Sequence, residues 1–227
     1  MKLTKKQAKA KYPNVTFIGD YFYIEKGAEI GEEVHIGKGA EIGDEVVIRK
    51  KATIEDKVVI KAGAEIRKGA YIGDKAIIGE GVQIGEEAYI GDKAIIGTRA
   101  EIGEGAEIRK GAYIGDEVII EKRATIKEWT YIGEETVIRA WAEIEEGAII
   151  GEKAKGVTAC LVICGLGNTK KLTAYLCDKG LEIVIGCFKG TLEEAQKEID
   201  EKYPDEHSYN YALLLINQWA VEKLEKE

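Results

Sequence analysis

The chain has 227 residues, and its 41 Asp and Glu against 33 Lys and Arg give a formal net charge of −8. This excess of acid argues against a nucleic-acid partner, because binding to polyphosphate requires clustered cations. No apolar run reaches the roughly 20 residues that span a bilayer, and the lysine-rich start "MKLTKKQAKAKYP" lacks the apolar core of a signal peptide. We therefore expect a cytoplasmic protein without a membrane or nucleic-acid partner.

Residues 1–14 are predicted to form a capping helix. The stretch "LTKKQAKAKYP" precedes the regular part of the chain, and a short helix there can lie over the first coil with Phe17 and Phe22 beneath it. An uncovered end of a repeat array exposes unpaired strand edges and an open core, which is an aggregation hazard.

Residues 15–155 follow a strict period of six. Isoleucine stands at position 18 and at every sixth position through Ile150, which makes 23 in register. Two residues before each isoleucine lies a small or β-branched residue, with Phe22 as the large exception. A helix would scatter this period around its circumference, whereas short strands joined by tight bends return the same side chain to the interior. Glycines near many bends suit positive φ angles, so we predict a solenoid of strands and bends.

The segment "IGEGVQIGEEAYIGDKA" resembles the hexapeptide repeat of the left-handed parallel β-helix, which a family of acyltransferases carries. The resemblance implies three hexapeptides in each triangular coil, and therefore about seven to eight coils between Ile18 and Ile150. At the ~4.8 Å spacing between neighbouring strands, the prism is roughly 35 Å long. The resemblance also implies a parallel homotrimer.

Such coils sort the outward position before each isoleucine into three faces of a prism. The first face contains Tyr23, Glu41, Val59, Ile77, Ile95, Tyr113, Tyr131 and Ile149. The second face contains Phe17, His35, Thr53, Tyr71, Tyr89, Glu107, Thr125 and Glu143. The third face contains Glu29, Val47, Glu65, Gln83, Glu101, Ile119, Val137 and Lys155.

The first face is the apolar one, and we predict that it is the interface of a homotrimer. Glycines follow most isoleucines of this face, so bare backbone lies beside the apolar column. A continuous apolar strip on a soluble protein marks an interface. The alternative is that isoleucine and tyrosine stand there for their strand propensity alone, which does not account for the glycines. The predicted interface residues are Ile77, Ile95, Tyr113, Tyr131 and Ile149.

No catalytic residue, metal or cofactor is predicted. The resembling acyltransferases use a histidine as general base and a long loop that leaves the coils to build the acyl-donor site. Here no hexapeptide is interrupted and His35 is the single histidine of the array, so we interpret it as an exposed strand residue. The related β-helical carbonic anhydrases bind zinc through three histidines, whereas this chain has two, His35 and His207.

Two tryptophans occupy bend positions three residues before an isoleucine, where Gly, Glu, Lys or Arg stands in the other regular bends. Trp129 and Trp141 lie on different edges of the prism in the last two coils. Tryptophan commonly provides buried aromatic surface, so we predict that the C-terminal segment docks over both.

Residues 156–227 are predicted to form a small α+β module that caps the solenoid and clasps neighbouring subunits. "TACLVICG", "KKLTAYLC" and "LEIVIGCF" have strand patterns, and "DKG" between the last two is a hairpin signal. Thr191 and Glu194 form a capping box before a helix that Pro204 ends, and a longer helix follows, which gives the order β-β-β-α-α. Through "IGCF" and "TLEE" the module resembles C-terminal modules of uncharacterised phage and bacterial hexapeptide proteins.

The cysteines and a glycine-rich turn are the remaining candidates for a site. Cys160 and Cys164 are four apart on a predicted strand, about 13 Å from each other, so we interpret them as small buried hydrophobes rather than zinc ligands. The turn "CGLGNT" could hold a phosphate or nucleotide on its backbone amides, but it leads into a strand, which favours a plain hairpin. Its candidate ligand residues are Gly165, Gly167, Asn168, Lys170 and Lys171.

These observations favour a non-catalytic structural or binding scaffold that assembles as a homotrimer. One alternative is a binder of a small ligand, such as a nucleotide or phosphate, through the C-terminal module or the clefts between subunits. Another alternative is a hexapeptide-type acyltransferase, because fold alone does not decide function. The 23 identical isoleucines and the surface of Glu, Lys, Arg and Asp also resemble an idealised or redesigned protein, although a natural repeat array can have the same features.

Overall fold

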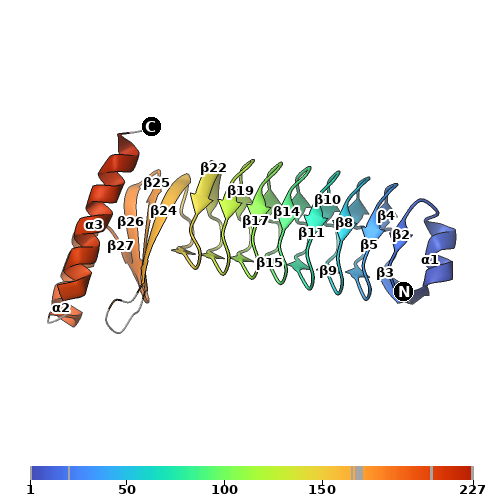
Figure 1. Cartoon of the computed structure of the whole chain (residues 1–227), viewed down its shortest axis with the longest axis horizontal. Helices are drawn as coiled ribbons and strands as arrows, with labels where there is room; N and C mark the ends of the chain where they lie inside the picture. Colours follow the sequence, from blue (N-terminus) through green and yellow to red (C-terminus); the bar gives the residue numbers. More distant parts are fainter. Residues whose placement is uncertain (1, 20, 165, 167–170, 205–206, 226–227) are drawn as a thin grey trace.

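The structure is an elongated solenoid of stacked coils with a helix at its N-terminal end and a helix-covered sheet at its C-terminal end (Figure 1). The prediction of a mostly β solenoid of about eight coils with a small α+β module is confirmed. The computed structural model describes residues 2–19, 21–164, 166, 171–204 and 207–225.

A short helix closes the N-terminal end. β1 (Lys2–Thr4) pairs antiparallel with β3 (Tyr21–Ile24) and leads into α1 (Lys5–Lys11). Thr4 caps this helix, because its side chain accepts a hydrogen bond from the Gln7 backbone N–H and the Gln7 side chain accepts one from the Thr4 backbone N–H. The sequence therefore starts the helix with a complete capping box.

Short parallel strands stack in three columns, and each regular strand pairs with the strands 18 residues before and after it. The first face contains β3, β6 (Glu41–Ile42), β9 (Val59–Ile60), β12 (Ile77–Ile78), β15 (Ile95–Ile96), β18 (Tyr113–Ile114), β21 (Tyr131–Ile132) and β23 (Ile149–Ile150). The second face contains β2 (Thr16–Phe17), β5 (His35–Ile36), β8 (Thr53–Ile54), β11 (Tyr71–Ile72), β14 (Tyr89–Ile90), β17 (Glu107–Ile108) and β20 (Thr125–Ile126). The third face contains β4 (Glu29–Ile30), β7 (Val47–Ile48), β10 (Glu65–Ile66), β13 (Gln83–Ile84), β16 (Glu101–Ile102) and β19 (Ile119–Ile120).

The last coil contains one longer strand that crosses an edge of the prism. β22 (Val137–Ile144) begins beside Ile119 on the third face and ends with Glu143 beside Thr125 on the second face. This strand is the one on which the C-terminal module continues.

The first coil departs from the predicted period at Ile18. Phe17 pairs with Ile36, which is one residue out of the predicted register. As a result Phe17 is 3% exposed in the core, whereas Ile18 is 52% exposed, so the expectation that all 23 isoleucines are interior is wrong at this residue. The physical reason is the aromatic end layer, in which the rings of Phe17 and Phe22 lie 4.8 Å apart.

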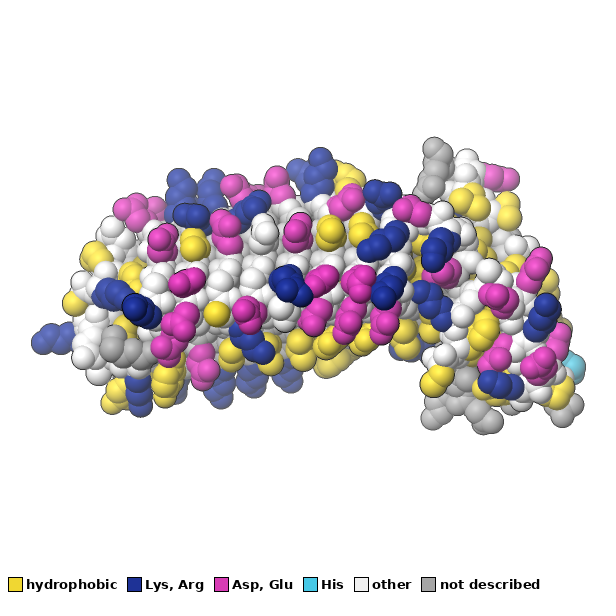
Figure 2. Space-filling view, turned by 180° about the vertical axis from the view of Figure 1, so that it is seen from behind, with side chains coloured by type: hydrophobic (Ala, Val, Ile, Leu, Met, Phe, Trp, Pro, Cys, Tyr) yellow, Lys and Arg dark blue, Asp and Glu magenta, His cyan; other side chains and the backbone are white. Residues whose placement is uncertain are grey.

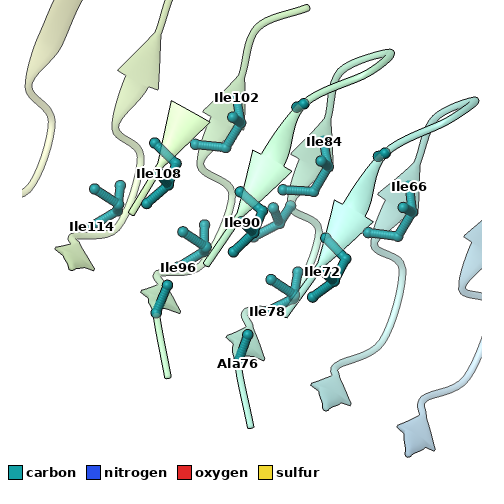
Figure 3. Packing of buried hydrophobic residues seen from close by; sticks show 14 of the residues in the cluster. Ile66, Ile72, Ala76, Ile78, Ile84, Ile90, Ile96, Ile102, Ile108 and Ile114 are labelled. Atoms are coloured by element: carbon teal, nitrogen blue, oxygen red, sulfur yellow. The ribbon is translucent and has the colours of Figure 1, made fainter. Parts of the chain in front are cut away.

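Columns of isoleucine and smaller residues fill the interior. Ile78, Ile96 and Ile114 stack along the first face, and Figure 3 shows how isoleucines from all three faces meet inside the prism. Ala76, two residues before Ile78, is also fully buried. Burial of one isoleucine side chain contributes about 1.5–3 kcal/mol, so the repeated columns are the main source of stability.

The bends place many non-glycine residues in the left-handed backbone region, which costs roughly 1–2 kcal/mol each. Hydrogen bonds between coils offset this cost. At Lys75, where φ is 59°, the backbone N–H donates to the Asp56 carbonyl at 2.9 Å, and the Asp56 N–H donates to the Asp74 carboxylate at 3.1 Å. The described non-glycine residues with positive φ are Glu33, Glu45, Lys51, Lys57, Lys75, Glu87, Lys93, Arg99, Glu117, Arg123, Trp129, Glu135, Trp141 and Lys153.

The C-terminal module extends the sheet and then covers it with helices. Its first strand pairs parallel with β22, and three further strands follow in antiparallel order. The last of these is a short strand that the order β-β-β-α-α did not include. The elements are β24 (Val157–Cys164), β25 (Lys171–Cys177), β26 (Gly180–Ile185), β27 (Phe188–Gly190), α2 (Leu192–Lys202) and α3 (His207–Leu224).

The sheet of this module separates two cores. Tyr175 and Val184 are buried in the same cluster as the solenoid isoleucines, and Lys189 Nζ donates to the Glu152 carbonyl at 3.0 Å. Ile183 and Ile216 belong to the second cluster, between the sheet and the helices. The module therefore covers the open end of the solenoid core.

Two glycines test the separate demands of the bend and of coil stacking. Gly63 has a φ of +68°, and the nearest atom to an added Cβ would be 4.0 Å away. Gly97 has no positive φ, but its Cβ would lie 2.5 Å from the Gly115 carbonyl carbon. We expect Gly63→Ala to lower the free energy of unfolding by about 1–2 kcal/mol and Gly97→Ala to lower it more, because two coils must separate. Denaturation midpoints followed by circular dichroism check this, and a wild-type midpoint for Gly97→Ala contradicts it.

Candidate functional site

The apolar strip of the first face is exposed to solvent in the single chain. Ile77, Ile95, Tyr113 and Tyr131 are 37–41% exposed, and Ile149 is half-buried. The rings of Tyr113 and Tyr131 stack with centres 5.0 Å apart. Burial raises the pKa of Tyr131, and neighbouring Tyr113 adds to the shift. The five predicted interface residues thus form one column, and their contact with another subunit stays a prediction.

A groove with a volume of about 720 Å³ runs along the third face in the N-terminal half of the solenoid. It contains two pairs of adjacent cations, Arg49 with Lys50 and Arg67 with Lys68. Figure 2, which shows one side of the molecule, illustrates how charged side chains of both signs stand among exposed backbone on the solenoid. The residues that line the groove are Glu29, Ile30, Gly31, Val47, Ile48, Arg49, Lys50, Glu65, Arg67, Lys68 and Glu86.

Neighbouring side chains orient two of these cations and leave the other two available. Arg49 Nε lies 3.4 Å from Glu65 Oε1, and Arg67 Nη2 donates to Gln83 Oε1 at 3.3 Å. Among the residues that the structure describes, the side chains of Lys50 and Lys68 have no polar partner. Guanidinium groups bind phosphate oxygens in a bidentate manner and ammonium groups act as mobile point charges, so this arrangement suits a phosphate-bearing ligand.

The sequence contains a signal for this groove that our prediction did not use. The dipeptide Arg-Lys follows Ile48 and again follows Ile66, one coil of 18 residues later. We sorted only the positions before each isoleucine into faces. Sorting the positions after each isoleucine by the same period places the four cations in two adjacent columns.

His35 lies on the second face, beside the edge that the groove borders. Its strand neighbours are Thr16 and Thr53, whereas Phe17 was predicted in place of Thr16. The residue is exposed, as predicted. Gly31 of the groove precedes His35 by four residues in the same coil, so the histidine and the groove flank one edge of the prism.

The C-terminal module leaves Trp129 uncovered, so the predicted docking is wrong at this residue. Trp129 is 56% exposed, and its ring lies over the backbone of Gly111 in the preceding coil. Trp141 is 64% exposed, with the Arg123 guanidinium 4.8 Å from its ring centre. It lines a cavity together with residues of β24 and α3. The module therefore approaches Trp141 without burying it.

The predicted ligand loop lies mostly outside the described residues. This applies to Gly165, Gly167, Asn168 and Lys170. Lys171 is described, and its Nζ donates to the Gly147 carbonyl at 2.6 Å. This lysine thus joins the module to the last coil.

The four cysteines are free thiols. Cys160 is buried, and this burial raises the pKa of its thiol to about 12. Cys164 is exposed, so the expectation of two buried cysteines on this strand is wrong for Cys164. Within the described ranges, no three His, Cys, Asp or Glu side chains are grouped as a metal site. None of the described helices combines the length and apolar character of a membrane span.

Two family models match the chain. Residues 74–167 match the model described as GMPPB C-terminal domain, and residues 51–86 match the model described as bacterial transferase hexapeptide (six repeats). The comparison with curated proteins gives no match. The predicted hexapeptide repeat and left-handed parallel β-helix are thereby confirmed.

Several solved structures of acyltransferases are similar to this chain in fold. The UDP-N-acetylglucosamine O-acyltransferase of Moraxella catarrhalis RH4 is 17% identical over 94% of this chain and 90% of that one, with a TM-score of 0.46. The UDP-N-acetylglucosamine acyltransferase of Campylobacter jejuni is 25% identical over 66% and 70%, with a TM-score of 0.34. The acetyltransferase domain of PglB from Neisseria gonorrhoeae FA1090 is 21% identical over 57% of this chain, which spans 54% of that domain, with a TM-score of 0.37.

The prediction of a non-catalytic scaffold as the main function is wrong. Residues 51–86 match a repeat described by its occurrence in bacterial transferases, which favours the acyltransferase alternative. The scaffold prediction depended on the uninterrupted coils and the missing donor loop. The groove supplies clustered cations from the coils themselves, at Arg49, Lys50, Arg67 and Lys68, so a donor site does not require that loop.

Proposed function

We propose that this chain, a hexapeptide-repeat protein with a left-handed parallel β-helix, is an acyltransferase whose donor site is the basic groove of the third face. The observation that supports this best is the overlap between the groove and the transferase-hexapeptide match at residues 51–86. Glu65, Arg67, Lys68 and Glu86 belong to both.

A coenzyme A thioester is the class of donor that suits this groove, because it joins phosphates to an activated acyl group. Arg49 and Arg67 are already oriented by Glu65 and Gln83, so they lose little freedom when they bind phosphate oxygens. Lys50 and Lys68 add two charges that the described residues do not neutralise. The volume of about 720 Å³ lies in the usual range for small-molecule sites.

His35 is the proposed general base, across the prism edge from the groove. The donor extends from the groove around this edge and brings its thioester carbonyl to His35. The hydroxyl or amine of the acceptor attacks that carbonyl, a C–O or C–N bond forms, and the C–S bond breaks. The imidazole takes the acceptor's proton and passes it to the leaving thiolate, so the products are the acylated acceptor and free coenzyme A.

Self-association through the first face is compatible with this site. The edge opposite the first face is the one between the second and third faces, where the groove and His35 lie. A homotrimer with its first faces turned inward therefore leaves both parts of the site on the outside.

Donor binding and turnover separate the two parts of the proposed site. We expect Lys50→Gln combined with Lys68→Gln to weaken coenzyme A binding at least about tenfold, because two charged contacts to phosphate are lost. His35→Ala should leave binding unchanged and lower acetyl transfer to a panel of amine and alcohol acceptors by about 10²–10⁴-fold. Calorimetry measures the binding, and chromatography of released coenzyme A measures the transfer.

The matched control is Lys75→Gln combined with Lys93→Gln, which removes the same charge from exposed bends outside the groove. A wild-type chain that does not bind coenzyme A, or an equal loss in this control, contradicts the donor site. Acetyl transfer that survives His35→Ala contradicts the assignment of the base.

The oligomer is tested by charging the apolar strip. We expect Ile77→Lys combined with Ile95→Lys to convert a trimer into monomers, because unpaired ammonium groups cannot be buried at the interface. Sedimentation equilibrium gives the mass. Ile119→Lys is the control, since Ile119 is 38% exposed like Ile95 but lies on the third face. A monomeric wild type, or an unchanged trimer in the double variant, excludes this interface.

A further inference from the structure

A second cavity, with a volume of about 520 Å³, lies where the last coils meet the C-terminal module. Trp141 on β22 and Trp219 on α3 both line it, and β24 provides a wall between them. Figure 1 shows α3 crossing the end of the solenoid beyond the sheet of the module. This cavity shares no residue with the basic groove.

Trp141 occupies a position that disfavours a large aromatic residue. It stands in a bend with φ of 64°, and it is 64% exposed. Glycine fills the corresponding position in eight other bends of the array. A bulky residue in the left-handed region is a backbone outlier of the kind that occurs at binding sites. The Arg123 guanidinium, 4.8 Å from the ring centre, shows that this ring already accepts a cation.

Carboxylates give the cavity its charge. Glu143 and Glu145 both pair with Lys127, at 2.6 and 2.9 Å, and the pKa of Glu143 is lowered chiefly by that hydrogen bond, with Lys223 contributing. Glu146 is exposed and has no polar partner among the described residues. The three carboxylates therefore outnumber the two lysines, and one negative charge remains uncompensated.

We propose that this cavity binds a small organic ammonium ion. A cation over an indole face gains about 0.5–2 kcal/mol, and Trp141 and Trp219 offer two such rings. Glu146 supplies the opposite charge. Leu161 and Val162 on β24 give apolar surface for the alkyl groups of the ligand.

Other classes of ligand suit the cavity less well. An anion would meet the carboxylates and the electron-rich ring faces, both of which repel it. A bare metal ion needs several donor groups close together, and within the described part of the chain no such group of three exists. An ammonium ion with an apolar body matches both the charge and the aromatic walls.

Choline and its uncharged carbon analogue, in which a quaternary carbon replaces the nitrogen, are the probes for calorimetry. We expect the wild-type chain to bind choline at least about tenfold more tightly than the analogue. Trp141→Gly should weaken choline binding about tenfold, within the range of cation–π energies. Glycine suits the positive φ of this bend, so the change removes the ring without new backbone strain.

Trp129→Gly is the matched control, because Trp129 occupies the same bend position and is exposed, but lies outside the cavity. It should leave choline binding unchanged. Glu146→Gln, a change at an exposed residue, should weaken binding without affecting the fold. A dissociation constant above ~10 mM for choline, equal affinity for the carbon analogue, or an equal loss in Trp129→Gly overturns the proposal.

Discussion

The structure depends on closing each coil in 18 residues, which requires three sharp bends for each turn of the solenoid. At every regular bend a residue with positive φ turns the chain, and its N–H donates to a carbonyl of the preceding coil, as at Lys75 and Asp56. The cost of the left-handed conformation falls on many residues that are not glycine. It is tolerated because each bend also places an isoleucine in the interior, where burial contributes more than the bend costs.

The same closure determines what the surface can do. Residues 18 apart lie directly above one another, so any side chain repeated at that spacing becomes a column. Tyr113 and Tyr131 stack in this way on the first face, and Arg49 with Arg67 does so on the third. A column of like charges is costly unless acids separate it or a ligand neutralises it. Glu65 accompanies Arg49 in this role, whereas Lys50 and Lys68 are left for a ligand.

The architecture was predictable from the sequence because a strict period leaves little choice of register. The three faces, the inward isoleucines and the apolar column all follow from counting in sixes and eighteens. The prediction failed at Ile18, where the period meets the end of the solenoid and the rings of Phe17 and Phe22 fill the last layer. It failed again at Trp129, whose ring packs on a glycine of its own solenoid rather than beneath the module.

The sites were harder to predict than the fold. The basic groove was within reach, because the Arg-Lys pairs after Ile48 and Ile66 repeat at the coil length. The aromatic cavity was not, because Trp141 and Trp219 are 78 residues apart and meet only through the packing of α3 against the module's sheet. No local pattern fixes that packing.

Chemical footprinting of lysines tests the donor groove most directly. The native chain is treated with an amine-reactive ester, with and without saturating coenzyme A, and the modified peptides are quantified by mass spectrometry. Bound donor should slow the labelling of Lys50 and Lys68 several-fold, since their ammonium groups contact its phosphates, and leave Lys75 and Lys93 unchanged. Equal labelling of Lys50 and Lys68 with and without coenzyme A would contradict a donor site in the groove.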